Sequence, residues 1–196
     1  MSKLQYYCAS SLDGYIAESD DSLTWLTGYE GSYDGADAEP SPMEAGGSYE
    51  RFYEGIGALV MGSATYEFIL DHQADGGSWP YAGKPTWVLT SRDLPEPEPE
   101  GDDVDVRIGA ATVEDIHDEV VAAAGERHVW VVGGGNVASQ YADAGLLDEL
   151  LLTIVPVVLG HGKPLFDRRL PGGALQLAGT SVFGSGMVEL RYELAR

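Results

Sequence analysis

Short apolar segments alternate with helix-like segments along the chain, and this alternation restricts the fold more than any other feature. It is typical of an α/β domain, in which helices cover a sheet. Residues 150–156 are nearly all apolar, which predicts a central strand covered on both faces. The pattern further predicts strands at 4–10, 58–62, 86–90 and 128–132, a short extended piece at 15–17, and helices at 63–70, after Ser48, after Thr112 and at 136–144.

The C-terminal residues predict an antiparallel hairpin. Residues 174–183 and 187–194 flank a Gly184-Ser185-Gly186 turn. In the second arm apolar and charged side chains alternate, and this period of two is typical of a strand with one apolar face and one charged face. The alternating residues are Val188, Leu190, Tyr192 and Leu194 against Glu189, Arg191 and Glu193.

The chain length of 196 residues fits one domain that spans 1–196. Residues 28–47 are rich in Gly, Asp, Glu and Pro and lack apolar periodicity, so we expect a long acidic loop there. Such a loop is either functional or an insertion without a role, and the sequence leaves both interpretations open.

Charge is the most unusual bulk property, because 32 acidic residues stand against 11 basic ones and give a formal net charge of −21. Binding to nucleic acid or to anionic lipid depends on Lys and Arg, so we expect neither partner. Salt would screen the self-repulsion of such a surface. The acidity is therefore either an adaptation to a salty cytoplasm or an ordinary property of an acidic protein.

Several other classes of protein are disfavoured. The longest apolar runs fall far short of the ~20 residues that a membrane helix needs, and the N-terminus shows no secretory signal, so the cytoplasm is the expected compartment. Cys8 is the only cysteine, which excludes an internal disulfide and a cysteine-based zinc site. The four histidines are scattered without metal-ligand spacing, so no metal site is expected.

The strand-turn-helix segment around Gly133-Gly134-Gly135 is the strongest signal of a binding site. Successive glycines allow the backbone to approach a diphosphate, and the helix that follows directs N–H groups and a positive dipole end toward it. The pattern Gly133-x-Gly135-x-x-Ala138 matches the dinucleotide fingerprint, but a Rossmann domain also needs an acidic residue that ends the next strand. Asp148 precedes its strand instead, so we reject the Rossmann fold and keep the phosphate site, against the alternative that the glycines only permit a tight turn.

Five motifs in order resemble dihydrofolate reductase. They are residues 4–17, the Met61-Gly62-Ser63-Ala64-Thr65-Tyr66 junction, Leu89-Thr90-Ser91-Arg92, the triple glycine and Leu151-Leu152-Thr153. Residues 11–17 and 156–166, with Gly160, Gly162 and Pro164-Leu165-Phe166, are more similar to the reductase domain of the bifunctional riboflavin-biosynthesis deaminase-reductase and its stand-alone relatives. The resemblance implies a single-domain dihydrofolate-reductase-like fold: a twisted, mixed, mainly parallel sheet flanked by helices, with NADPH across its carboxyl edge.

The same resemblance implies a set of cofactor contacts. Ala9 and Ile16 would contact the nicotinamide through their backbones, and Arg92 would meet the 2′-phosphate. Ser63 stands where the family often has arginine, which leaves Arg92 to discriminate NADPH from NADH, unless Arg92 is a solvated loop residue; NADH remains an alternative cofactor. The other implied cofactor residues, from the phosphate-binding junctions and the adenosine side, are Gly62, Thr65, Thr90, Ser91, Val132, Gly133, Gly134, Gly135, Asn136 and Val137.

The substrate side offers weaker candidates. Asp13 would bind a polar substrate group or transfer a proton, although Asp-Gly is also an ordinary turn pair. Trp25 would form the floor of the pocket or pack in the core. In dihydrofolate reductase a carboxylate at the start of the first helix binds the substrate. Glu44 and Glu50 are the carboxylates nearest to that position in this sequence, but neither aligns with it, which disfavours true folate reduction. Lys163 would hold a substrate phosphate or have no role.

The leading interpretation is an NADPH-dependent reductase that transfers a hydride to a small polar heterocycle or a ribosylamino-pyrimidine. Two alternatives stay open, a non-catalytic nucleotide-binding module and a true dihydrofolate reductase. Exposed sheet edges and the apolar residues 155–159 also predict a homodimer.

Overall fold

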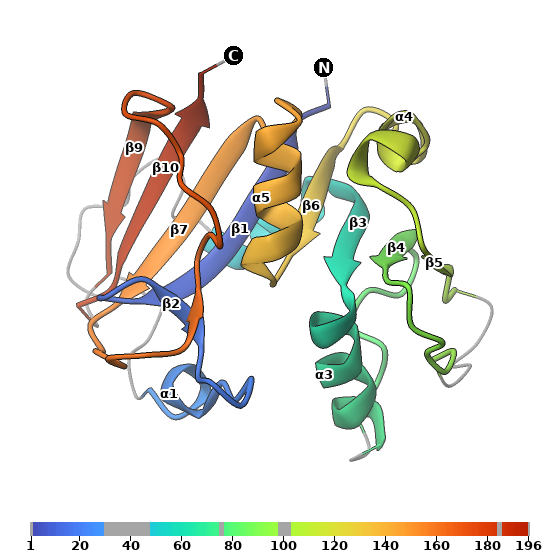
Figure 1. Cartoon of the computed structure of the whole chain (residues 1–196), viewed down its shortest axis with the longest axis horizontal. Helices are drawn as coiled ribbons and strands as arrows, with labels where there is room; N and C mark the ends of the chain where they lie inside the picture. The colour runs from blue at the N-terminus through green and yellow to red at the C-terminus, as the bar shows by residue number, and fades with distance from the viewer. Residues whose placement is uncertain (1, 30–47, 75–76, 98–102, 184–185, 196) are drawn as a thin grey trace.

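A computed structural model describes residues 2–29, 48–74, 77–97, 103–183, 186–195 and shows a large mixed sheet with helices on both faces (Figure 1). This confirms the predicted α/β fold with its C-terminal hairpin. The strands are β1 (Leu4–Ser11), β2 (Tyr15–Ala17), β3 (Ile56–Gly62), β4 (Thr86–Leu89), β5 (Val106–Gly109), β6 (His128–Val132), β7 (Glu149–Val155), β8 (Lys163–Pro164), β9 (Leu175–Val182) and β10 (Val188–Leu194). The helices are α1 (Thr24–Thr27), α2 (Ser48–Glu54), α3 (Ser63–Ala74), α4 (Val113–Ala124) and α5 (Gly135–Asp143).

Eight strands form the main sheet in the order β5-β4-β3-β6-β1-β7-β10-β9. The strands from β5 to β7 in this order are parallel, whereas β10 runs antiparallel to both β7 and β9. β2 and β8 form a separate antiparallel pair. The carboxyl ends of β1, β3 and β6 therefore lie along one edge of the sheet (Figure 1).

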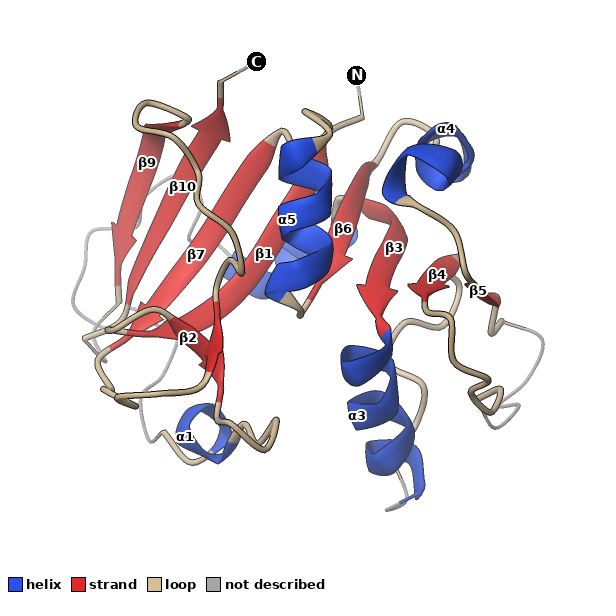
Figure 2. Cartoon of the chain, viewed as in Figure 1, coloured by secondary structure: helices blue, strands red, loops and turns tan. Residues whose placement is uncertain are grey.

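Helices lie against the sheet (Figure 2), and an apolar layer packs on each of its faces. On one face, α4 and α5 bury Ile116, Val120 and Tyr141 against β1, β3, β6 and β7. On the other face, Phe52 of α2 and Tyr66 of α3 pack with residues of the same sheet. Within the described residues, no helix is both long enough and apolar enough to cross a bilayer.

The start of α4 shows how a local signal fixes an element boundary. Thr112 is the N-cap, and its Oγ1 accepts a hydrogen bond from the Asp115 backbone N–H at 3.2 Å. The Asp115 carboxylate in turn accepts one from the Thr112 N–H at 3.1 Å. This reciprocal capping box begins the helix that the sequence predicts after Thr112, and such a cap contributes about 1 kcal/mol to helix stability.

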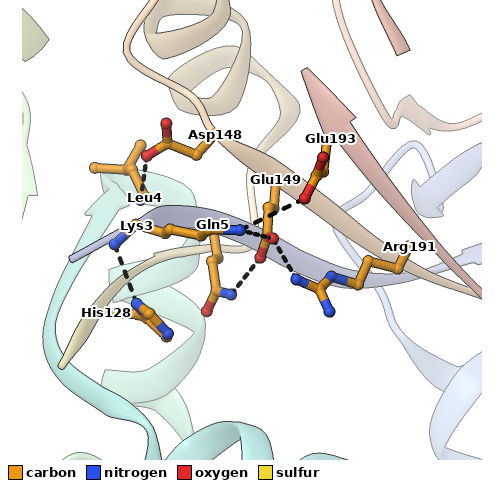
Figure 3. A network of polar contacts seen from close by, with 8 residues as sticks. All are labelled: Lys3, Leu4, Gln5, His128, Asp148, Glu149, Arg191 and Glu193. Atoms are coloured by element: carbon orange, nitrogen blue, oxygen red, sulfur yellow. Dashed lines mark hydrogen bonds and ion pairs between the residues drawn. The ribbon is translucent and has the colours of Figure 1, made fainter. Parts of the chain in front are cut away.

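Part of the charged face of β10 is buried rather than exposed to solvent. Glu189 is buried on that face, and so is Glu149 in the neighbouring strand β7. Figure 3 shows how Glu149 is accommodated: Lys3 Nζ and Arg191 both donate to its Oε1 at 2.5 Å, and Gln5 donates to its Oε2 at 2.6 Å. Charge-assisted hydrogen bonds of this kind offset the cost of burying a carboxylate.

Three elements were not predicted, namely α1, β5 and β8. β5 is the edge strand of the sheet and only half of its residues are partly buried, so its sequence carries little apolar signal. β8 has two residues and depends on pairing with β2, which lies far away in the sequence. The predicted acidic loop at 28–47 falls outside the described residues from position 30 onward.

Candidate functional site

Two helices begin at the carboxyl edge of the sheet. α3 begins at Ser63 directly after β3, and α5 begins at Gly135, three residues after the end of β6. Because β3 and β6 are neighbouring parallel strands, both helix N-termini lie at the same edge. The first N–H groups of a helix lack intrahelical acceptors and carry the positive end of its dipole, so this edge suits an anion.

The triple glycine joins these helix starts. Gly133 has φ +71°, and a Cβ at this position would collide with Thr65 Oγ1. A Cβ at Gly135 would lie 2.5 Å from the Leu165 carbonyl oxygen. Gly134 differs from both, since a Cβ there would meet no atom of the described residues within 4 Å. Packing therefore requires the first and third glycines, whereas the middle one faces open space.

A cavity of about 460 Å³ lies beside this turn. Gly134, Asn136 and Thr65 form its polar end, and the Gly134 N–H points to Thr65 Oγ1 at 3.4 Å. The remaining wall is mostly apolar and comes from β1, β2, the region of α1, and α3. Its lining residues there are Tyr7, Cys8, Ala9, Ile16, Ala17, Leu23, Leu26, Ala64 and Phe68, with Asp21, Lys163, Pro164 and Asp167 at its margin. An apolar pocket of this volume with a few polar groups is typical of a small-molecule or cofactor site.

A second cavity of about 860 Å³ adjoins the first between residues 20–27 and α3. The two cavities share Asp21, Leu23, Ala64 and Phe68. The second cavity is acidic, because Asp20, Glu67 and Asp71 also line it. We call the two adjoining cavities the cleft.

Seven of the predicted cofactor residues line the first cavity. They are Ala9, Ile16, Thr65, Gly133, Gly134, Gly135 and Asn136. Ala9 and Asn136 lie 127 positions apart in the sequence yet line the same cavity. Their arrangement fits a dinucleotide, with helix N-termini at one end and the backbone of β1 and β2 at the other.

The other predicted cofactor residues do not line the first cavity. Gly62 and Val132 end β3 and β6, and Val137 is buried in the core beside Gly62. Thr90 and Ser91 follow β4, and the Thr90 hydroxyl accepts a hydrogen bond from the Arg92 N–H at 3.0 Å.

Arg92 is held by an ion pair that the sequence did not indicate. Its two terminal nitrogens donate to both carboxylate oxygens of Glu67, at 2.9 and 2.5 Å. Glu67 lies on α3 and lines the second cavity. Both side chains are substantially exposed, so the pair can open at little cost.

Asp13 lies outside both cavities, and neighbouring groups hydrogen-bond its carboxylate. Its carboxylate accepts hydrogen bonds from Ser11 Oγ at 2.7 Å and from the N–H groups of Leu159 and Gly160 at 3.1 and 2.7 Å. The Ser11 hydroxyl, supported by these amides, lowers the pKa of Asp13, which keeps it ionised and makes it a poor proton donor. Asp13 lines neither cavity, and it ties the end of β1 to residues 159–160.

Of the two other predicted substrate-side residues, the structure describes Trp25 but not Glu44. Trp25 is buried with Val155, Phe183 and Met187, and it lines neither cavity, whereas its neighbours Leu23 and Leu26 do. Trp25 therefore supports the pocket wall from the core rather than forming its surface. Glu44 lies outside the described residues.

Cys8 was not predicted as a site residue, yet it lines the first cavity. Burial raises the pKa of the Cys8 thiol to about 12, so it stays protonated and is not a nucleophile at neutral pH. Over the same described ranges, no group of His, Cys, Asp and Glu is arranged to hold a metal ion.

The comparisons with known proteins agree with this architecture, and the chain has a dihydrofolate-reductase-like fold. Over 99% of its length it superposes on dihydrofolate reductase from Enterococcus faecalis complexed with NADP(H), with a TM-score of 0.56 at 19% identity and 97% of that chain covered. Residues 64–189 match the model of the family described as the RibD C-terminal domain. The chain belongs to this family.

Individual relatives support the same assignment. The uncharacterized protein YwjB of Bacillus subtilis is 30% identical over 97% of both chains. A protein from Shewanella sp. PV-4 assigned to riboflavin biosynthesis is 26% identical with a TM-score of 0.77, over 99% of both chains. A diaminohydroxyphosphoribosylaminopyrimidine deaminase/5-amino-6-(5-phosphoribosylamino)uracil reductase from Thermotoga maritima superposes with a TM-score of 0.63 at 15% identity, over 99% of this chain and 57% of that one.

Proposed function

We propose that the protein is an NADPH-dependent reductase that transfers a hydride to a small polar heterocycle. One observation carries this proposal: the open middle glycine, Gly134, and the starts of α3 and α5 face the same cavity. Two solved proteins that share the fold support it: the Thermotoga protein is named a reductase, and the Enterococcus protein is complexed with NADP(H).

The residues present fit a dinucleotide. The first amides of α5 and α3, together with the Thr65 hydroxyl, would hold the diphosphate, and Gly134 leaves the space that the phosphates need. The backbone at Ala9 and Ile16 would bind the nicotinamide amide at the other end of the cavity. The bound cofactor would supply the hydride.

The protein would align the two reactants and exclude water from the reacting carbons. Leu23, Ala64 and Phe68 line both cavities with apolar side chains, which would exclude water from the reacting carbons. Hydride transfer depends on alignment of the donor and acceptor carbons more than on one particular side chain. The neutral Cys8 thiol and the backbone of β1 would form the floor for the nicotinamide ring.

The preference for NADPH over NADH is assigned to Arg92. The guanidinium would exchange Glu67 for the 2′-phosphate, a move that the exposure of both partners permits. NADH has no such phosphate, so Arg92 would stay with Glu67 and add nothing to NADH binding.

A cofactor titration followed by a substrate panel tests the proposal. We expect saturable NADPH binding and loss of NADPH absorbance with at least one polar heterocycle. Tight binding without any turnover would instead indicate a nucleotide-binding module, and turnover of dihydrofolate with methotrexate inhibition would indicate a true dihydrofolate reductase. Absence of binding to either nicotinamide cofactor would overturn the proposal.

We also propose that two copies pair through the edge strand β9. Leu177 and Val182 are 57% and 58% exposed, and they share a sheet face because they pair with Tyr192 and Val188 of β10. An exposed apolar edge strand is a template for pairing with another chain. Sedimentation should show a dimer that Leu177→Lys with Val182→Lys converts to a monomer; a monomeric parent protein would contradict this proposal.

A further inference from the structure

Residues 163–167 connect the two ends of the first cavity. At one end β8 pairs with β2, the strand that carries Ile16 and the proposed nicotinamide contact. At the other end a Cβ on Gly135, the first residue of α5, would meet the carbonyl oxygens of Pro164 and Leu165. In a nicotinamide dinucleotide, a ribose joins the nicotinamide to the diphosphate. This segment would therefore lie alongside that ribose.

Asp167, at the end of this segment, is held at the beginning of α5. Its Oδ2 accepts a hydrogen bond from Asn136 Nδ2 at 2.5 Å, and its backbone N–H donates to Ser139 Oγ at 3.3 Å. Gln140 Nε2 donates to Asn136 Oδ1 at 2.8 Å, which fixes the orientation of the Asn136 side chain. These contacts place the Asp167 carboxylate beside the helix turn whose backbone amides are assigned to the diphosphate.

The Asp167 carboxylate is ionised at neutral pH. Partial burial alone would raise its pKa, but the hydrogen bonds with Asn136 and Ser139 and the charge of Arg168 outweigh burial and hold the pKa below its ordinary value. Arg168 Nε lies 3.6 Å from Asp167 Oδ1, so its guanidinium offsets the negative charge that a diphosphate would meet. An ionised carboxylate accepts hydrogen bonds and donates none. The oxygens of a diphosphate are acceptors too, so they cannot be its partners.

The same carboxylate can accept a further hydrogen bond from a ligand. The Asp167 side chain is 35% exposed and lines the first cavity. A carboxylate has about four lone-pair sites, which is more than Asn136 and Ser139 occupy. The nicotinamide amide is assigned to the backbone at Ala9 and Ile16, so the donors that a dinucleotide offers beside its diphosphate are the ribose hydroxyls.

Resting on the proposed function, we propose that Asp167 binds a hydroxyl group of the nicotinamide ribose. The carboxylate would accept a charge-assisted hydrogen bond from the hydroxyl and fix the ribose between β8 and α5. Asp167 would thereby position the nicotinamide ring along β1. This role differs from the role of Arg92, because NADPH and NADH share the nicotinamide ribose and differ in the 2′-phosphate.

Three ligands with the same adenosine end test this inference. NADPH contains the nicotinamide and its ribose, 2′-phospho-ADP-ribose keeps the ribose without the nicotinamide, and the terminal methyl ester of adenosine 2′-phosphate 5′-diphosphate lacks both. The methyl group keeps the charge of the diphosphate equal in all three. Calorimetry, with competition against NADPH for weak ligands, gives the dissociation constants for the parent protein and for Asp167→Ala.

We expect both ligands that contain the ribose to lose about 10-fold in affinity relative to the methyl ester in Asp167→Ala, the equivalent of ~1.4 kcal/mol. Comparison of ligands on one protein cancels any change at the diphosphate, including loss of the contact with Asn136. NADH should lose as much affinity as NADPH. Asp118→Ala removes an exposed carboxylate of α4 outside both cavities, and it should leave the relative affinities within about two-fold of the parent values.

Each other outcome overturns a defined claim. An equal change for all three ligands, or a greater loss for the methyl ester, would show that Asp167 acts on the diphosphate or on the turn and would overturn the inference. A loss confined to NADPH would assign the carboxylate to the nicotinamide amide and overturn it as well. If Asp167→Ala does not fold, Asp167→Asn replaces it, with the same order of ligands and a several-fold loss expected. Failure of the parent protein to bind any of the three ligands would count against the proposed function instead.

Discussion

Glu149 is the residue whose surroundings most affect stability. Its side chain is fully buried and receives hydrogen bonds from Lys3, Gln5 and Arg191 (Figure 3). Glu149→Gln removes the charge that these donors share, and we expect a loss of about 2 kcal/mol in the free energy of unfolding. Urea denaturation measures this loss. Glu193→Gln is the control, because Glu193 is exposed and lies 3.6 Å from Lys3, so its loss should stay below about 1 kcal/mol.

The same network predicts how stability changes at low pH. Burial alone raises the pKa of Glu149, but the hydrogen bonds from Arg191, Lys3 and Gln5 outweigh it and lower the pKa below its ordinary value. Burial lowers the pKa of His128, whose Nδ1 accepts a hydrogen bond from the Lys3 N–H. Both groups therefore contribute stability above their ordinary pKa values, and this contribution falls as the pH drops from those values to the lowered ones.

Thermal unfolding between pH 7 and pH 3 checks this expectation. Loss should begin below about pH 6.5 through His128 and steepen below about pH 4.5 through Glu149. Glu149→Gln should flatten the lower part of the profile. An unchanged profile in that variant would show that other carboxylates control acid unfolding.

The Arg92–Glu67 pair predicts a separation of the two nicotinamide cofactors. Arg92→Ala should weaken NADPH binding about 10-fold, the equivalent of ~1.4 kcal/mol, and change NADH binding little. Glu67→Gln should tighten NADPH binding, because the guanidinium then has no competing carboxylate. Fluorescence titration of both cofactors measures these changes. Equal losses for NADPH and NADH in Arg92→Ala would assign Arg92 to the surface.

At the scale of elements, local signals predicted the long strands and helices well. The buried strand β7 and the capping box of α4 carry their information within a few neighbouring residues, so the sequence was sufficient. β8 and α1 depend on contacts with distant residues, and no local pattern marks them.

The candidate site also has features that the local sequence predicted and features that depend on distant residues. The glycine turn was predictable because its backbone requirements appear directly as glycine residues, and it lines the cavity as expected. The ion pairs of Arg92 with Glu67 and of Lys163 with Asp21 were not, since their partners lie 25 and 142 positions away. Asp13 illustrates the limit most clearly: an Asp-Gly pair predicts a turn, but the amides of residues 159–160 decide what the carboxylate does.

For the whole molecule, the net charge of −21 predicts a strong response to salt. Several acids are paired with the few cations, but many exposed carboxylates of the described surface repel one another. If the acidity is an adaptation to high salt, the unfolding temperature should rise steadily between low and molar KCl. A flat curve would show that the acidity is an ordinary surface property.

The most direct test of the account is an NADPH titration of the parent protein beside Gly134→Ala. The added methyl group meets no atom of the described residues within 4 Å and enters the space assigned to the diphosphate. We predict saturable binding by the parent protein and about 10-fold weaker binding by the variant, with an unchanged unfolding temperature. Equal affinity in the two proteins, or no binding by the parent, would contradict the claim that this turn holds a nicotinamide dinucleotide.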